Sequence, residues 1–148
     1  MKKHEKLGIT AQELIALKGV RDGLKYGLFE HRDAADPEHP TSRIFNMGVW
    51  QNKVSEAHDE DGRTWSCGTV GCIGGWMGML FTPLLFKNQK LAKTLEYEWQ
   101  YSPPLKALFY PDIQGNLWTF ITNEDAVKAI NKFLKGDKFP WQFVEDRY

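Results

Sequence analysis

Apolar residues recur at helical spacing near the start of the chain, where they predict an amphipathic helix. Thr10 followed by Glu13 has the sequence of a capping box, in which each side chain accepts a hydrogen bond from the other residue's backbone amide. We expect the helix to run to about Tyr26 and Gly27 to end it in a left-handed conformation. Its apolar side carries four leucines at this spacing: Leu14, Leu17, Leu24 and Leu28.

The strongest helical pattern lies near the end of the chain. Thr122 is a suitable N-cap, and Gly136 with Pro140 marks the end of the predicted helix. The face expected to be buried consists of Ala126, Ala129, Ile130, Phe133 and Leu134.

A glycine-rich apolar stretch in the middle predicts a central buried helix. No charged residue occurs between Thr64 and Phe86, and we expect a helix that begins near Gly68 or Thr69 and ends before Pro83. On that helix Gly68, Gly71, Gly75 and Gly78 would share one stripe, with Cys72, Ile73, Trp76 and Leu80 on the other side. Each glycine costs up to about 1 kcal/mol of helix stability relative to alanine, so the stripe indicates close approach of a backbone or a ligand.

Shorter patterns complete the expected fold. Residues 43–52 predict a short extended piece packed on the core, and a hairpin is possible between Trp50 and Trp65. Ser102 followed by two prolines predicts a short helix that stops at Pro111, residues 117–121 favour a β-strand, and the aromatic tail at 139–148 should pack down. We therefore expect a mainly α fold with a minor β part: a single domain, residues 1–148, around a central glycine-rich helix with one or two short β-hairpins.

Composition and charge narrow the function. The 148 residues hold nineteen basic and nineteen acidic side chains, so no net field favours nucleic-acid binding. The basic N-terminus is not followed by the apolar region of a signal peptide, which predicts a cytoplasmic protein with reduced cysteines. Glycines and Pro83 interrupt the apolar stretch in the middle of a polar chain, so we expect no membrane insertion.

Three sequence elements together resemble a known group of proteins. They are FNMGVW at Phe45–Trp50, CGTVGCIGGW at Cys67–Trp76, and the helical stretch that ends in Pro140 and Trp141. The chain resembles short, uncharacterised phage and bacterial proteins with an FxMxxW element followed by CGTxxCIxGW. The resemblance implies a phage or bacterial origin, with the host cytoplasm as the location if the protein is phage-encoded, and it implies no particular chemistry.

Cysteine chemistry is one candidate function. A cysteine just before a helix lies near the positive end of the helix dipole, which stabilises a thiolate, so Cys67 is the candidate nucleophile. His58 is the histidine placed to act as its base. The competing interpretation, in which both cysteines pack as small apolar groups, is favoured. Cys67 and Cys72 are poorly spaced for a shared metal ion, and we expect neither a metal nor a cofactor.

Ligand binding at the same helix start is the leading hypothesis. Amides near Thr69 and Gly71 would donate hydrogen bonds to an anion, and an aromatic wall of Trp50, Trp65 and Trp76 would stack on a planar group. We expect a non-enzymatic phage or bacterial binding protein that recognises a small anionic or nucleotide-like ligand, or a host protein. The alternative is a cysteine-dependent hydrolase or transferase that uses Cys67 with His58.

Overall fold

The computed structural model describes residues 1–31, 44–47, 51–52, 70–85 and 101–148 of the chain. Within these ranges most residues are helical, as a mainly α fold requires. The helices are α1 (Lys3–Leu7), α2 (Ala11–Lys25), α3 (Ile73–Leu85), α4 (Lys106–Phe109), α5 (Asn123–Leu134) and α6 (Gln142–Glu145), with 3-10 helices η3 (Pro103–Leu105) and η4 (Gly115–Phe120). No described helix is both long and apolar enough to cross a membrane.

The capping box at the start of α2 is confirmed. The Glu13 amide donates to the Thr10 hydroxyl at 3.0 Å, and the Thr10 amide donates to the Glu13 carboxylate at 2.8 Å. Gly27 has φ 75°, the left-handed conformation expected beyond the helix end. The prediction for Leu28 is wrong, because its side chain is 60% exposed and the neighbouring Phe29 enters the core instead.

Helix α5 agrees with its prediction residue by residue. Thr122 accepts a hydrogen bond from the Asp125 amide at 3.1 Å, and Asp125 accepts one from the Thr122 amide, which completes a second capping box. All five residues predicted for the buried face are buried. Gly136 follows with φ 92°.

The central helix begins later than the sequence suggested. Val70 and Gly71 form strand β4, and α3 starts only at Ile73. The expectation that the helix ends before Pro83 is wrong, because α3 continues to Leu85; a kink with non-helical angles occurs at Phe81, two residues before Pro83. Gly75 and Gly78 lie in the helix as predicted, whereas Gly71 belongs to the sheet and Gly68 lies outside the described residues.

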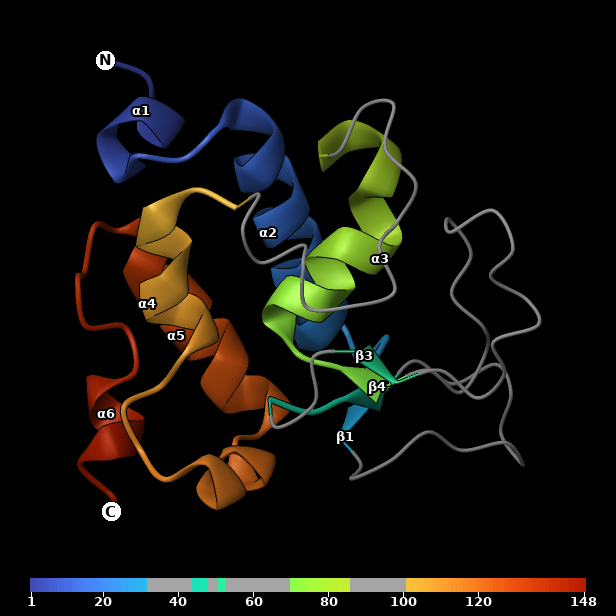
Figure 1. The fold of residues 1–148 in the computed structure, drawn as a ribbon, viewed down its shortest axis with the longest axis vertical. Helices are drawn as coiled ribbons and strands as arrows, with labels where there is room; N and C mark the ends of the chain where they lie inside the picture. Colours follow the sequence, from blue (N-terminus) through green and yellow to red (C-terminus); the bar gives the residue numbers. More distant parts are fainter. Residues whose placement is uncertain (32–43, 48–50, 53–69, 86–100) are drawn as a thin grey trace.

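Four two-residue strands form a small sheet at the end of the molecule where α3 begins (Figure 1). They are β1 (Glu30–His31), β2 (Ile44–Phe45), β3 (Gln51–Asn52) and β4 (Val70–Gly71), in the order β1-β2-β4-β3. β2 pairs in parallel with β1 and β4, while β3 pairs antiparallel with β4. The predicted extended piece is therefore present as β2, with Ile44, Phe45 and Met47 buried. The turn expected between Trp50 and Trp65 lies outside the described residues.

Two other local predictions differ from the structure. The run from Leu117 to Ile121 is not a strand, because residues 115–120 form η4 and Ile121 alone of the run is buried. Ser102 does stand at the N-terminal end of η3, but its hydroxyl donates to Glu13 rather than capping the helix. The tail packs down through Trp141, whose indole donates to the Leu108 carbonyl at 2.7 Å.

Helix α2 lies between α3 on one side and α5 on the other, and one apolar core runs through all three (Figure 1). Two glycines of α2 allow close approach of an aromatic ring, while the close approach expected at the glycines of α3 stays a prediction. A Cβ added to Gly19 would lie 2.4 Å from the ring of Phe81, and one added to Gly23 would lie 2.4 Å from the ring of Phe29. Both rings lie against the α2 backbone because no side chain stands between them.

Candidate functional site

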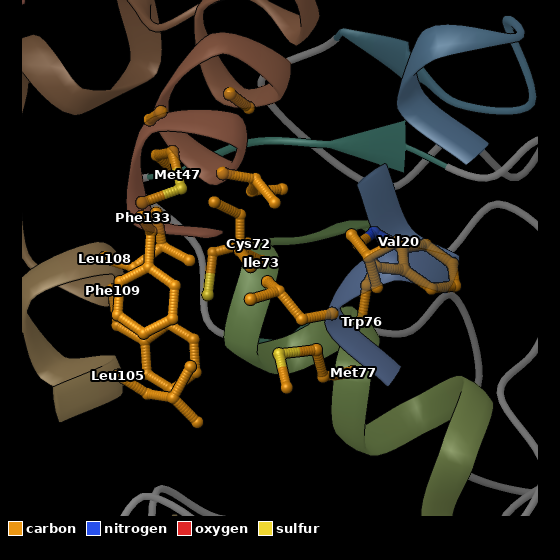
Figure 2. Close-up of a cluster of buried hydrophobic side chains, with 14 of the residues drawn as sticks. Val20, Met47, Cys72, Ile73, Trp76, Met77, Leu105, Leu108, Phe109 and Phe133 are labelled. Atoms are coloured by element: carbon orange, nitrogen blue, oxygen red, sulfur yellow. The ribbon is translucent and has the colours of Figure 1, made fainter. Parts of the chain in front are cut away.

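The predicted site at the start of α3 contains a buried cysteine that caps the helix. The Cys72 carbonyl accepts the first helical hydrogen bond, from the Trp76 amide at 2.9 Å, so Cys72 is the N-cap. Its sulfur accepts from the Gly75 amide at 3.4 Å. Cys72 is 3% exposed, and Figure 2 shows it in one cluster with Met47, Ile73 and Phe133. The expectation that Cys72 lies within the helix is therefore wrong, because the helix starts after it.

Trp76 belongs to the core and does not face a ligand. Its side chain is fully buried, and its indole N–H donates to the Ile44 carbonyl at 2.8 Å. Its ring meets Phe29 edge to face, with the centroids 4.9 Å apart. A buried indole with a satisfied N–H stabilises the fold, which corrects the prediction of Trp76 as part of a stacking wall.

Gly71 is also placed differently from the prediction. It pairs with Phe45 on one side and with Gln51 on the other, inside the sheet. Its amide is therefore on a strand and not on the first turn of a helix. The other predicted site residues, Trp50, His58, Trp65, Cys67 and Thr69, lie outside the described residues, and their proximity stays a prediction.

A second candidate site is a groove in the surface of the described part of the chain. Its volume is about 360 Å³, within the range of small-molecule sites. It is formed where α1, the start of α4 and the end of α5 meet, at the N-terminal end of the molecule (Figure 1). We call it the α1–α5 groove; its lining residues are Lys6, Leu7, Pro104, Ala107, Phe133, Gly136, Asp137 and Lys138.

The floor of the groove is apolar and its rim is charged. Phe133 is 5% exposed and joins the groove to the core, while Leu7 packs on the core from α1. Lys6 and Lys138 are both exposed, and neither forms an ion pair with another described residue. Two ammonium groups are therefore available beside apolar surface, which suits an anion with an apolar body.

The negative groups at the groove already form hydrogen bonds or an ion pair with neighbouring residues. Asp137 accepts a hydrogen bond from the Phe139 amide at 2.8 Å and lies 3.9 Å from the Lys132 ammonium. The last turn of α5 carries the negative end of the helix dipole, but amides of residues 135–137 bond to its carbonyls. The two lysines of the rim are thus not neutralised by their neighbours.

Sequence reasoning missed this groove for a clear reason. Its walls come from residues 6–7, 104–107 and 133–138, and only the tertiary fold brings these segments together. The one signal in the sequence is the basic N-terminus, which resembles the start of a signal peptide and does not indicate a ligand site. Helix α1, which carries Lys6 and Leu7, was not predicted at all.

The ion pair between Arg147 and Asp125 has a structural role. Arg147 donates two hydrogen bonds to Asp125, at 2.8 and 2.9 Å, and so ties the C-terminal segment to the start of α5. Burial raises the pKa of Asp125, but hydrogen bonds from Arg147 and Thr122 and the charge of Arg147 together hold it below its ordinary value. The same hydrogen bond raises the pKa of Arg147. Because both groups are satisfied by each other, this pair is not a reactive centre.

Comparison with known proteins assigns no function to the start of α3 or to the α1–α5 groove. No protein family, curated protein or solved structure matches the chain. Among the described residues no group of three or more potential metal ligands comes together. The function is therefore inferred from the geometry of the α1–α5 groove.

Proposed function

We propose that this protein is a non-enzymatic binding protein that holds a small anionic ligand in the α1–α5 groove. The observation that carries the proposal is the combination of an apolar cavity of about 360 Å³ with Lys6 and Lys138, two lysines that have no ion-pair partner among the described residues. Apolar sites with a few convergent polar groups are the usual form of a small-molecule site. A phage or bacterial origin, proposed from the sequence resemblance, is compatible with such a role.

The α1–α5 groove is favoured over the start of α3 as the ligand site because the residues at the start of α3 are buried. Cys72, Ile73, Gly74 and Gly75 are all buried, so the first turn of α3 faces the core. An anion that approached these amides would have to enter apolar surroundings without a cation, at a large desolvation cost. A nucleotide-like ligand or a host protein held by Trp50, Trp65 and Thr69 stays a prediction about residues outside the described part.

Cysteine-dependent catalysis is the alternative to binding. It requires Cys67 with His58, and both lie outside the described residues. Cys72 does not replace Cys67 as nucleophile, because it is 3% exposed and its sulfur already accepts the Gly75 amide. Titration of the two thiols with a maleimide between pH 5 and 9 separates the functions. A thiol that reacts fully near pH 6 supports catalysis, and two thiols with ordinary or slow reactivity support binding.

A search for copurified ligands tests the proposal directly. The full chain is purified without denaturation, and bound small molecules are extracted and identified by mass spectrometry. The matched control is Ala107→Phe, which fills the groove from an exposed position and should leave the core intact. We expect an acidic molecule with the wild-type protein and its loss with the folded Ala107→Phe variant. An absence of any acidic ligand, or equal recovery from both proteins, contradicts the proposal.

A further inference from the structure

The chemistry of the groove indicates which anion it would hold, an inference that rests on the proposed function. Phosphate groups are bound by several donors at once, commonly arginine forks, hydroxyls and clustered backbone amides. The lining contains no arginine and no hydroxyl residue, and its cations are the two lysines. Asp137 also stands in the wall, so two lysines and one aspartate give the lining a net charge of +1, which matches a monoanion. These features favour a monoanion with few hydrogen-bonding demands.

The apolar part of the groove indicates the rest of the ligand. Leu7, Pro104, Ala107 and Phe133 supply a continuous set of aliphatic and aromatic contacts from α1, η3, α4 and α5. Gly136 leaves the opening unobstructed, because nothing lies within 4 Å of where its Cβ would be. We infer that the α1–α5 groove binds an amphipathic monocarboxylate, with its alkyl chain on this floor and its carboxylate beside Lys6 and Lys138.

Isothermal titration calorimetry with octanoate, 1-octanol and acetate tests the inference on the full chain. For a ligand of this size we expect octanoate to bind with a dissociation constant on the order of 1 mM or below. Exposed ion pairs are worth little individually, so 1-octanol should bind about two- to tenfold more weakly. Acetate, which has the charge without the chain, should not bind. Higher ionic strength should weaken octanoate binding and leave 1-octanol unaffected.

Two charge variants and one control locate the carboxylate. Lys6→Gln and Lys138→Gln should each weaken octanoate binding about two- to fivefold and leave 1-octanol binding unchanged. Lys135→Gln is the matched control, because Lys135 is exposed near the same helix end and does not line the groove. It should bind octanoate like the wild type. Each substituted lysine is exposed, so we do not expect the variants to lose their fold.

The outcomes separate this inference from the proposed function. Equal affinities for octanoate and 1-octanol, or equal effects of Lys135→Gln and Lys138→Gln, overturn the inference. If octanoate does not bind but a different acidic ligand copurifies and is lost in Ala107→Phe, the monocarboxylate is wrong and the groove is still a binding site. If octanoate does not bind and no such ligand copurifies, both proposals fail.

Discussion

A methyl group added at Gly23 tests the packing of α2 on the core. The new Cβ would lie 2.4 Å from Cε2 and 3.1 Å from Cδ2 of Phe29. Phe29 is 4% exposed and its ring stands against Trp76, which is itself fixed by the hydrogen bond to Ile44. The ring therefore cannot turn away without displacing a second buried side chain.

The expected change in the free energy of unfolding follows from two opposing effects. Overpacking of a core typically costs about 1 to 3 kcal/mol, and alanine is favoured over glycine within a helix by about 1 kcal/mol. Because Phe29 is held on its far side, we expect Gly23→Ala to lower the free energy of unfolding by about 1 to 2 kcal/mol net. Gly19→Ala meets the ring of Phe81 at the same 2.4 Å, but Phe81 is only half-buried and its ring is freer to move. Its loss should be smaller, about 0 to 1 kcal/mol.

Urea unfolding followed by tryptophan fluorescence measures both changes. Gly115→Ala is the control, because nothing lies within 4 Å of its Cβ position, and its stability should differ from the wild type by less than about 0.5 kcal/mol. The slope of the free energy against urea should stay constant across the series. A Gly23→Ala protein as stable as the wild type, or more stable than Gly19→Ala, would refute the packing of Phe29 between α2 and Trp76.

Urea unfolding also tests two further substitutions. Cys72→Ser should change the free energy of unfolding by less than about 1 kcal/mol, because serine is a preferred N-cap and its hydroxyl accepts the Gly75 amide, which offsets its burial; a loss above 2 kcal/mol would contradict the N-cap assignment. Asp125→Asn should be less stable than the wild type at pH 7, and the difference should shrink as the pH falls below about 4. The sign follows because the folded pKa of Asp125 lies below its unfolded value, so its stabilisation is present above the unfolded pKa and is lost as the pH falls through the folded one. A difference that is constant from pH 7 to pH 3 would contradict the ion pair with Arg147.

Helices with both a capping signal and a clear apolar face were predictable from the sequence. The boxes at Thr10 and Thr122 involve residues three apart, so their hydrogen bonds form wherever the local backbone turns into a helix. The buried face of α5 followed from its spacing alone. In these segments the local preference for a helix agrees with the tertiary packing, so the short-range pattern was sufficient to predict the helix.

The central segment was harder because its local signals conflict with its tertiary setting. Thr69 has the chemistry of an N-cap, yet Val70 and Gly71 are held in a sheet by residues 44–45 and 51–52, which are distant in sequence. The helix is therefore delayed until Cys72 can cap it. Similarly, Leu117–Ile121 has β-rich composition but no strand partner in the described part of the chain, and it forms a 3-10 helix.

The close glycine contacts that the structure describes were not predicted. They are at Gly19 and Gly23 of α2, whereas the close approach expected at the glycine stripe of the central segment stays a prediction. For the candidate site, the two predicted ligand residues that the structure describes, Gly71 and Trp76, belong to the sheet and the core. The α1–α5 groove depends on three segments that meet only in the folded chain.

The most direct test of the central claim is a map of where the ligand binds. Backbone amide NMR spectra of the ¹⁵N-labelled full chain are recorded during an octanoate titration, and the shifted amides are assigned. The account predicts saturable shifts at Leu7, Ala107 and Gly136, with residues 72–76 at the start of α3 unchanged. Saturable shifts centred on residues 72–76 would contradict the claim that the α1–α5 groove is the binding site, and the absence of saturable shifts around the groove would contradict a monocarboxylate as its ligand.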